Sequence, residues 1–403
     1  MSSNPKIRFG EFNGAWKQAT LREISDKVMD KNSDFSVREV FTNSAEHGVM
    51  SQKDFFNHAI VNEKNINGYY VVCPNDFVYN PRMSVTAPVG PINRNALGRT
   101  GIMSPLYYIF RTHDIDVEYL DYFFKTRIWH HFMWNNGDNG ARGDRFSIKN
   151  EVFQEMPIPY PSTPEEQHKI AQFFTGIDSL IAAEGKKLVK LKNIKNASLE
   201  KMFPRNGETT PQVRFKGFTE EWEEKTIGEC FSERKERSGD GEMLSVTIGY
   251  GVRKAKELDR IVHINNTSNY KVVRQGDIAY NSMRMWQGAS GYSPYDGIVS
   301  PAYTVLIPKE SINSQFFARL FKTKQMIHVF ELNSQGLTSD TWNLKYGQLK
   351  NIPIIYPVDE KEQIYIANFF SRLDTLISAQ EQKVFKLRCL KKSFLEKMFV
   401  TTK

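Results

Sequence analysis

The sequence contains one long stretch twice, and this duplication constrains the fold more than any other feature of the chain. Residues 155–203 and 351–399 align without a gap at a constant offset of 196, and 23 of the 49 aligned positions are identical. Both stretches begin with Pro-Ile-x-Tyr-Pro and end with Leu-Glu-Lys-Met-Phe. A repeat of this kind has to be recognised before local elements are assigned. The sequence therefore predicts two equivalent halves.

The repeat continues outside this stretch, because shorter motifs recur in the same order in both halves. Arg8-Phe9 returns as Arg214-Phe215, and Gly101-Ile102 returns as Gly297-Ile298. A chain of 403 residues is also too long for one typical hydrophobic core. We therefore expect four consecutive parts: a mixed domain at residues 1–160, a long helix at 161–205, a second mixed domain at 206–357 and a second long helix at 358–403.

The first 150 residues or so of each half have the pattern of a mixed α/β domain. Short β-rich segments are bounded by Gly, Pro, Asn and Asp, which is typical of strands joined by turns. Helical patterns cover Val117–Met133 and Asn313–Leu332. The strand candidates are Gly68–Val72, Asp76–Tyr79, Tyr107–Arg111, Ser245–Gly249, Asp277–Tyr280 and Ala302–Ile307.

The duplicated stretch becomes helical from Pro164 onward. Thr163 can cap a helix, Pro164 suits its first turn, and two glutamates follow where the helix dipole favours negative charge. Apolar residues then recur at alternating steps of four and three, which predicts the narrow stripe of a coiled coil. The predicted stripe comprises Ile170, Phe174, Ile177, Ile181, Glu184, Leu188, Leu191, Lys195 and Met202, and in the copy Ile366, Phe370, Leu373, Ile377, Gln380, Val384, Leu387, Lys391, Phe394 and Met398.

The length of the stripe favours pairing of the two helices with each other. A helix from Glu165 to Phe203 would be about 58 Å long at a rise of about 1.5 Å per residue. A domain of 150 residues has a radius of gyration of only about 15 Å, so packing of each helix on its own domain is the less favoured alternative. The polar stripe positions can fix the register of the pair at some cost in stability.

The composition limits the classes of function. Lys and Arg exceed Asp and Glu by 54 to 46, which favours an anionic partner without requiring one. The three cysteines lie far apart, so the spacing supports neither a disulfide framework nor a structural zinc site. The N-terminus lacks the pattern of a signal segment, and no run of about 18 apolar residues occurs. We therefore expect a cytoplasmic protein that does not span a membrane.

Two dissimilar globular halves, each followed by a similar long helix, resemble the specificity subunit of type I restriction-modification enzymes. The resemblance covers nearly the whole chain and includes Arg8-Phe9 to Trp16 with Arg214-Phe215 to Trp222. Its individual motifs are loose, but their doubled order is specific. The other residues that carry it are Pro157, Glu166, Gln167, Ile170, Ala171, Phe173, Phe174 and Asp178, with Pro353, Glu362, Gln363, Ile366, Ala367, Phe369, Phe370 and Asp374 in the copy.

The resemblance implies an α+β fold: two mixed α/β target-recognition domains separated by two long helices in an antiparallel coiled coil, with an internal pseudo-twofold repeat. Each domain would read one half of a split double-stranded DNA sequence, and the helices would dock two modification subunits. In this family the modification subunits methylate adenine from S-adenosylmethionine, and restriction subunits add ATP-driven translocation and cleavage. The chain itself is expected to have no catalytic residue, cofactor or metal; S-adenosylmethionine, ATP and Mg belong to the partners.

Base reading needs side chains that reach base edges, such as Arg and Lys for guanine or Asn and Gln for adenine. The loops Asn135–Arg145 and Asn333–Thr341 align in position and differ in content, as two readers of different sequences should. The segments Tyr79–Ser84 and Tyr280–Gln287 each follow a predicted strand. The candidates for DNA contact are Asn80, Arg82, Arg94, Asn95, Arg99, Asn135, Asn136, Asn139, Arg142, Arg145, Asn281, Arg284, Trp286, Gln287, Asn333, Ser334, Gln335, Thr338, Ser339 and Thr341.

Each of these candidates also has a plainer interpretation. The two loops can be solvent loops between a helix and a strand. Asp76, Tyr79 and Asn80 have copies in the second half and are better suited to a structural turn, because residues common to both halves cannot distinguish two sequences. Arg94, Asn95 and Arg99 form a glycine-flanked basic stretch that is better suited to phosphate than to bases.

Two other classes of protein stay open at the level of sequence. One is a DNA methyltransferase or nuclease with its own recognition domains. Tyr79-Asn80-Pro81 is partly similar to the Asn-Pro-Pro-Tyr motif, but Arg82 follows, and neither a Phe-x-Gly-x-Gly loop nor a phosphate-binding Gly-x-x-x-x-Gly-Lys-Ser/Thr loop occurs. The other class is a coiled-coil adaptor that does not bind DNA; it predicts no salt-sensitive DNA affinity.

Overall fold

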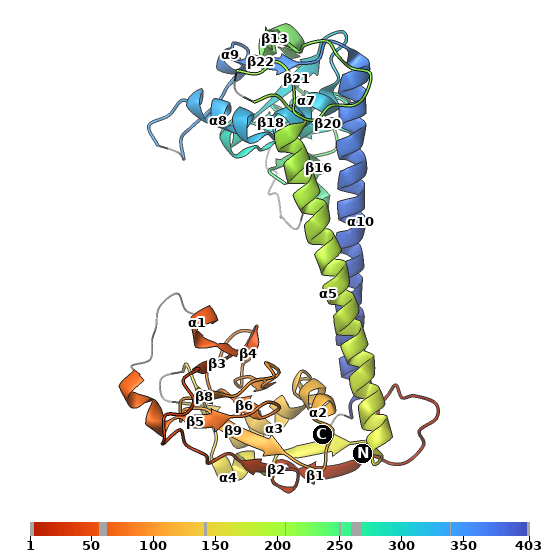
Figure 1. Ribbon diagram of the computed structural model, residues 1–403. Helices are drawn as coiled ribbons and strands as arrows, with labels where there is room; N and C mark the ends of the chain where they lie inside the picture. Colours follow the sequence, from red (N-terminus) through yellow and green to blue (C-terminus); the bar gives the residue numbers. More distant parts are fainter. Residues whose placement is uncertain are drawn as a thin grey trace. The chain divides into compact units, whose positions relative to one another are not determined.

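The chain divides into two compact units with nearly the same order of elements; among the described residues, the pair β10 (Asp138–Asn139) and β11 (Phe146–Ser147) occurs only in unit 1, and η4 (Met285–Gln287) only in unit 2 (Figure 1). Unit 1 comprises Met1–Ala183 with Lys383–Lys403, and unit 2 comprises Glu184–Gln382. Each unit therefore contains one mixed α/β domain, the start of one long helix and the end of the other. The structure, a computed structural model, describes residues 4–55, 63–140, 143–205, 207–249, 251–258, 267–338 and 340–400.

Unit 1 is built on a four-stranded antiparallel sheet in the order β2-β9-β6-β7, with strands Ser25–Lys27, Tyr108–Thr112, Phe77–Tyr79 and Ile92–Arg94. Antiparallel pairs surround it: β1 Lys17–Thr20 with β12 Pro157–Tyr160, β3 Phe41–Ser44 with β4 Gly48–Ser51, β5 Tyr70–Val72 with β8 Gly101–Met103, and β10 Asp138–Asn139 with β11 Phe146–Ser147. The short helices are η1 Leu21–Glu23, α1 Gln52–Phe55, η2 Glu63–Gly68, α2 Val117–Phe124, α3 Ile128–Asn136 and α4 Asn150–Phe153.

Unit 2 repeats this arrangement with the sheet β14-β21-β18-β19, whose strands are Phe231–Glu233, Tyr303–Pro308, Ile278–Asn281 and Ser290–Tyr292. Its antiparallel pairs are β13 Glu223–Thr226 with β22 Pro353–Tyr356, β15 Leu244–Thr247 with β16 Gly251–Lys254, and β17 Lys271–Val273 with β20 Gly297–Val299. The short helices are α6 Ile227–Cys230, η3 Ala255–Glu257, η4 Met285–Gln287, α7 Ser314–Leu320, α8 Lys324–Leu332 and α9 Tyr346–Leu349.

The six predicted strands are present within one or two residues of their expected bounds, but the two predicted domain helices are each broken in two. The break falls at a threonine that both halves share. The hydroxyl of Thr126 donates to the carbonyl of Phe123 at 2.6 Å, and that of Thr323 donates to the carbonyl of Leu320 at 2.8 Å. These side chains offer the backbone an alternative hydrogen bond, which ends one helix and begins the next.

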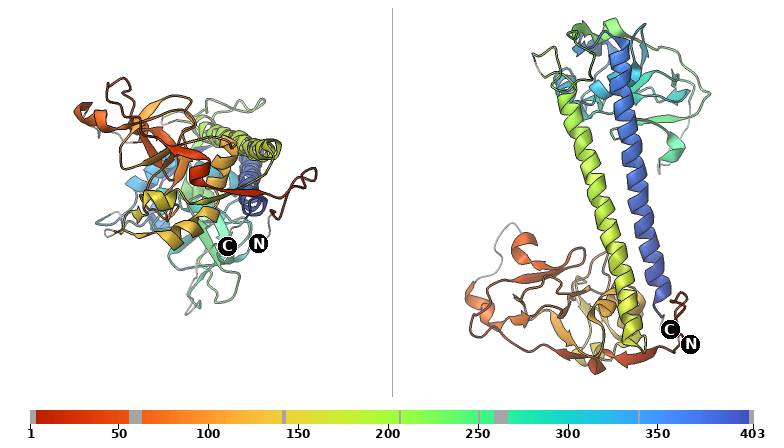
Figure 2. Two further views of the ribbon diagram at one scale, coloured as in Figure 1. Left: turned by 90° about the horizontal axis from the view of Figure 1, so that it is seen from below. Right: turned by 45° about the vertical axis from the view of Figure 1, so that its right-hand side comes forward.

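The predicted pairing of the two long helices is confirmed. They are α5 Pro164–Lys201 and α10 Glu360–Met398, and they run side by side and antiparallel in each unit (Figure 2). In unit 1 the rings of Phe173 and Phe394 lie 5.1 Å apart, and in unit 2 Lys195 binds Asp374 at 2.7 Å. Every residue of the predicted stripe is buried or half-buried. Among the helices that the structure describes, none is both long and apolar enough to span a membrane.

The polar stripe positions are paired with one another or with acidic neighbours. Glu184 is buried, and its carboxylate accepts a hydrogen bond from the side-chain amide of Gln380 at 2.7 Å. Lys391 binds Asp178 at 2.5 Å, and the repeat-related pair is that of Lys195 with Asp374. These bonds offset the cost of the polar groups in the helix pair and favour one register.

The glutamate and glutamine that follow the proline box attach each long helix to its domain. Glu166 is buried and accepts two hydrogen bonds from Arg8, at 2.6 and 2.7 Å; Glu362 binds Arg214 at the same distances. Bidentate charged pairs of this kind are among the stronger hydrogen bonds in proteins. The side chain of Gln167 donates to the carbonyl of Pro161 at 3.0 Å and accepts from the backbone amide before α2 at 2.9 Å.

The last residues of each long helix complete the core of a domain other than the one that precedes the helix. Met202 and Phe203, at the end of α5, belong to the core of unit 2. Met398 and Phe399, which follow on α10, belong to the core of unit 1. The closing Leu-Glu-Lys-Met-Phe motif is therefore a structural contact in both copies.

Candidate nucleic-acid interface

The two segments of unit 1 that were predicted as separate DNA-reading segments, around Arg82 and Arg145, form one surface. The backbone amide of Met83 donates to the carbonyl of Asp144 at 3.0 Å, and that of Phe146 donates to the carbonyl of Pro81 at 2.8 Å. Arg82 and Arg145 lie opposite each other in the bridge between these bonds. The fold therefore brings two arginines from distant parts of the chain together. Both side chains are exposed.

The asparagines of unit 1 have different roles in this surface. Asn80 is a positioning residue: its side-chain oxygen accepts from the amide of Arg82 at 3.0 Å, and its amide group donates to the carbonyl of Asn43 at 2.8 Å. Three candidates, Asn135, Asn136 and Asn139, lie exposed at the end of α3 and in β10. The candidate Arg142 lies outside the described residues.

A hollow of about 450 Å³ adjoins the paired arginines. Its polar lining includes residues that the sequence analysis missed, chiefly Thr42 and Tyr107, whose hydroxyls lie 3.2 Å apart. Tyr107 belongs to the motif Ser104-Pro105-x-Tyr107, which recurs as Ser300-Pro301-x-Tyr303, but the motif alone does not show that its side chain borders the candidate readers. This hollow gives unit 1 a concave surface with amide, hydroxyl and guanidinium groups, the types that recognise base edges and phosphates.

Unit 2 brings the equivalent two segments together with different side chains. The amide of Leu344 donates to the carbonyl of Ser282 at 2.8 Å, and the rings of Trp286 and Trp342 lie 5.2 Å apart. Trp342 was not a candidate, because it lies just beyond the predicted loop. The surface also includes Arg284, which is exposed and donates to Gln287 at 3.1 Å.

The remaining candidates of unit 2 are held mainly by local bonds. The side chain of Asn281 accepts from the amide of Met283 at 3.0 Å, as Asn80 does in unit 1. Asn333 and Ser334 donate to carbonyls in the last turn of α8. The backbone of Gln335 pairs with that of Asn343, and the hydroxyls of Thr338 and Thr341 lie 3.4 Å apart; Ser339 lies outside the described residues.

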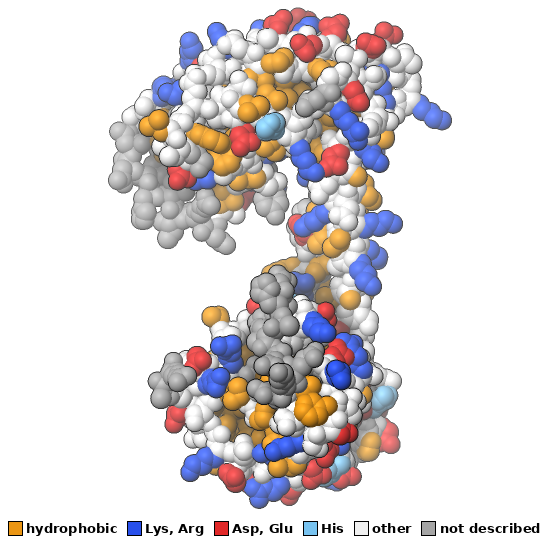
Figure 3. Space-filling view, turned by 60° about the vertical axis from the view of Figure 1, so that its left-hand side comes forward, with side chains coloured by type: hydrophobic (Ala, Val, Ile, Leu, Met, Phe, Trp, Pro, Cys, Tyr) orange, Lys and Arg blue, Asp and Glu red, His pale blue; other side chains and the backbone are white. Residues whose placement is uncertain are grey.

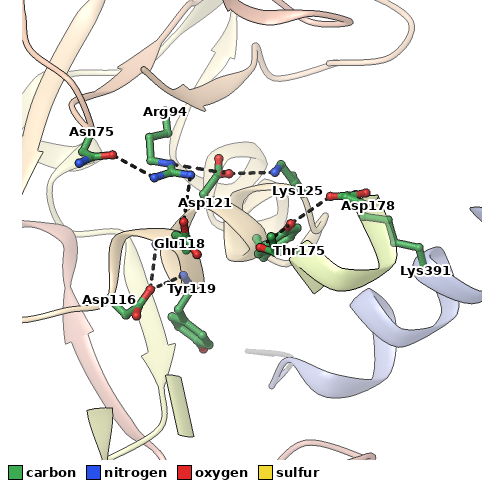
Figure 4. A network of polar contacts seen from close by, with 11 residues as sticks. Asn75, Arg94, Asp116, Glu118, Tyr119, Asp121, Lys125, Thr175, Asp178 and Lys391 are labelled. Carbon is green, nitrogen blue, oxygen red and sulfur yellow. Dashed lines mark hydrogen bonds and ion pairs between the residues drawn. The ribbon is translucent and has the colours of Figure 1, made fainter. Parts of the chain in front are cut away.

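The basic stretch that was expected to contact phosphate is engaged within unit 1. Arg94 donates to Asn75 at 2.9 Å and lies 3.9 Å from the carboxylates of Glu118 and Asp121 (Figure 4). Arg99 makes two bonds of 2.8 Å to Glu39, and these bonds lower the pKa of Glu39. Much of the positive charge of the stretch is therefore already balanced by the protein.

Asn95 has a structural position rather than an exposed one. It is fully buried, and its amide donates to the carbonyls of Cys73 and Arg99 at 3.0 Å. Its equivalent in unit 2 is Ser293, because both residues donate their backbone amides to the carbonyl of a buried aspartate at 2.8 Å. We therefore remove Asn95 from the set of residues that can reach DNA.

The shared aspartate of the predicted turn is likewise structural. Asp76 is buried and accepts from the amide of Cys73 at 2.7 Å and from Arg111 at 2.8 and 2.9 Å. Asp277 also accepts a hydrogen bond from a backbone amide. Its arginine partner is Arg234, which follows strand β14, whereas Arg111 lies on β9. Both units thus keep a paired buried carboxylate at the start of the central strand.

A hollow of about 650 Å³ in unit 2 lies away from these segments. It is lined by the end of α5, by the start of α8 and by β22. We do not assign it to the interface, because the exposed candidates of unit 2 do not line it.

Comparison with known proteins places these observations in a family. The model of the type I restriction modification DNA specificity domain matches residues 59–193 and 219–386. No curated protein matches the chain in sequence.

Two solved structures have a similar fold. One is the type I restriction-modification system S subunit from M. genitalium, with 14% sequence identity, a TM-score of 0.58, and coverage of 99% of this chain and 100% of that chain. The other is a chain from a study of complex assembly and conformational transition of the type I R-M system, with 13% identity, a TM-score of 0.57, and coverage of 95% and 97%. Their low identity limits the likeness to the fold.

Proposed function

Because the chain belongs to the family of type I restriction-modification DNA specificity domains, as a non-catalytic specificity subunit, we propose that its two units read the two halves of a bipartite DNA target. The half-sites would be separated by a fixed spacer that neither unit reads. The observation that carries this proposal is the contrast between the repeated helices and the dissimilar exposed segments. Many helix residues recur in both copies, whereas the segments that meet carry an arginine pair in unit 1 and a tryptophan pair in unit 2.

The same contrast supports the proposal that the chain binds two copies of one partner protein. Two similar helix copies can bind two identical proteins, which in this role are two modification subunits and, through them, restriction subunits. The chain would bind no cofactor, and S-adenosylmethionine, ATP and Mg would be bound by the partners. The proposed place of action is the cytoplasm, where these partners and DNA meet.

The direct test is to express the chain with a modification subunit and to map methylated adenines across a genome. The proposal predicts a motif with two specified parts and a spacer of constant length. A contiguous motif, or methylation without sequence preference, would contradict it. Replacing the chain by an empty vector controls for methylation by the host.

A change in helix length tests the spacer separately. Seven residues added to both α5 and α10 keep the coiled-coil period and lengthen each helix by about 10 Å at about 1.5 Å per residue. That distance corresponds to roughly three base pairs of about 3.4 Å each. We expect the same half-sites with a spacer longer by about three base pairs. An unchanged spacer in an active variant would show that the helices do not set it.

A further inference from the structure

Apolar side chains gather on the surface where the two candidate segments of unit 2 meet. Leu337 is fully exposed and Met283 is 44% exposed, while Trp286 and Trp342 are half-buried. Figure 3 shows apolar side chains exposed on the face of unit 2 that it displays. Single exposed apolar residues need no explanation, but a group of them marks an interaction surface. We call these four residues the apolar cluster.

The two tryptophans are the fixed part of the apolar cluster. Their rings lie 5.2 Å apart at an interplanar angle of 72°. The indole nitrogen of Trp286 also donates to the carbonyl of Met283 at 3.1 Å. The tryptophans therefore join the two segments that carry the exposed side chains of Met283 and Leu337.

The loop that presents Leu337 is closed by hydrogen bonds on both sides of this residue. Before it, the backbone groups of Gln335 and Asn343 exchange two bonds of 3.0 and 2.8 Å. After it, the amide and the hydroxyl of Thr341 each donate to the carbonyl of Thr338 at 2.9 Å. Figure 1 shows the segment after α8 projecting from unit 2 as a loop. Leu337 is thus held away from the core of its own unit, where a ligand can reach it.

The surroundings of the apolar cluster indicate which part of DNA it fits. Arg284 is exposed and bonds to the half-buried Gln287 at 3.1 Å. Arginine and glutamine bind guanine and adenine in the major groove, where thymine presents its 5-methyl group to apolar side chains. An apolar surface bordered by these two residues therefore fits a half-site that includes thymine.

Apolar side chains can also bind DNA as wedges inserted between bases in the minor groove. Two features of unit 2 favour the methyl contact. The rings of Trp286 and Trp342 pack edge to face, so neither ring has both faces free to stack between bases. The bordering Arg284 and Gln287 are side chains whose bidentate partners lie in the major groove.

We propose that Met283 and Leu337 read thymine methyl groups in the half-site of unit 2, on a surface held by Trp286 and Trp342. The proposal rests on the proposed function and deepens it, because it names the base that this unit recognises. The half-site of unit 2 then contains at least one specified T·A pair.

The test replaces each thymine of the mapped target, one at a time, with deoxyuridine, which lacks only the 5-methyl group. The full chain in complex with the modification subunit is titrated with each DNA. At one or two positions of one half-site, uracil should weaken binding about fourfold, as expected from about 0.8 kcal/mol for one buried methyl group.

M283A and L337A then connect each methyl group to a side chain. A variant that lacks the contact should bind the thymine DNA less tightly and should no longer distinguish thymine from uracil at its position. Such non-additive losses are the signature of a direct contact. The response to uracil in the half-site of unit 1, whose segments meet at Arg82 and Arg145, should stay as in the wild type.

The matched control is V358A. Val358 is 46% exposed in unit 2 but lies between β22 and α10, outside both candidate segments. This variant should keep the full difference between thymine and uracil. The ratio of the two affinities is the informative quantity, because a general loss of stability lowers both affinities alike.

The outcomes separate this proposal from the proposed function. Target half-sites without thymine, or binding that uracil changes at no position, would overturn the methyl contact while bipartite reading stands. An equal response to uracil in the wild type, M283A and L337A would also overturn it, as would unstacking of 2-aminopurine in the half-site with no effect of uracil, which identifies a wedge. A wild-type complex without sequence preference overturns both proposals.

Discussion

The domains of unit 1 and unit 2 share the residues that hold the fold and differ in the residues that are offered to a ligand. Glu166 and Glu362 each bind an arginine at 2.6 and 2.7 Å, in the same geometry. Where the two candidate loops meet, however, unit 1 has Arg82 beside Arg145 and unit 2 has a pair of tryptophans. The comparison of the two units therefore distinguishes the residues that maintain the fold from the residues that are available to a ligand.

The buried aspartates show how far the shared part can vary. Asp76 is paired with an arginine on β9, whereas Asp277 is paired with one that follows β14. An unpaired buried carboxylate would be costly, so the pairing is retained while the partner moves to an adjacent strand. The requirement is for a bound carboxylate rather than for a particular residue.

The largest expected effect on stability concerns Glu166 and Glu362, which attach each long helix to its domain. Glu166→Ala and Glu362→Ala each leave a half-buried arginine without its partner, which typically costs about 3–5 kcal/mol. Because Trp16 also donates to Glu166, at 3.3 Å, the effect in unit 1 should be the larger of the two. Urea unfolding followed by hydrogen exchange in each unit measures both changes. Equal loss in both units from one substitution would contradict the separation into two compact units.

A smaller loss of stability is expected at Glu184 and Gln380, which are repeat-related positions of the two long helices. Gln380→Glu places a second carboxylate against buried Glu184 and removes a hydrogen bond to a charged group, worth about 1.5–3 kcal/mol. The loss should be greatest at neutral pH and shrink as the pH falls through the range where glutamates become protonated. Glu184→Gln is the control, because two amides can still bond to each other. Equal destabilisation at pH 4 and pH 7 would argue against charge repulsion.

Substitutions in the reading surfaces should act on one half-site only. Arg82→Ala or Arg145→Ala is expected to weaken discrimination at one base pair by about 1–3 kcal/mol, if the guanidinium binds guanine. Arg284→Ala should do the same in the other half-site. Methylated-site maps of the three variants measure this directly. A uniform loss of affinity over all sequences, with a shallower salt dependence, would instead identify phosphate contacts.

The smallest effect is expected at Arg99. Its guanidinium is already held by two bonds to Glu39, so Arg99→Ala should leave both the specificity and the salt dependence of DNA binding unchanged. Because the pair is exposed, its loss should also cost little stability. The pKa of Glu39 is lowered by this bond, so the bond stabilises the fold above the ordinary glutamate range and is lost as the pH falls. If Arg99→Ala instead reduced the slope of log K against log salt concentration by about one, Arg99 would be identified as a phosphate contact.

The helix pair could be predicted from the sequence because its evidence is periodic and doubled. Steps of four and three over more than thirty residues leave few alternatives, and the offset identifies the partner helix. The strands were predicted for the same reason, since alternation and turn residues are local signals. The break at Thr126 and Thr323 was missed, because a single side chain there outcompetes a favourable helical pattern.

The candidate site was less predictable, because it depends on contacts between distant segments. Nothing local in the sequence places Arg82 beside Arg145, and the bridge between them follows from the fold. Asn95 was taken for an exposed residue because its structural equivalent, Ser293, is a different residue, so the repeat did not reveal the shared turn. Polar residues near glycine look alike in sequence whether they face solvent or close a buried turn.

The exchange of helix ends between the two cores also sets an order of folding during synthesis. The core of unit 2 receives Met202 and Phe203, which are made before its own domain. The core of unit 1 must wait for Met398 and Phe399, made 196 residues after their repeat equivalents. At about 5–20 residues per second, the first domain stays incomplete for roughly 10–40 seconds while the ribosome supplies the rest. Until Phe399 is made, the rings of Tyr119, Phe123 and Phe174 lack the aromatic neighbour that they have in the complete fold.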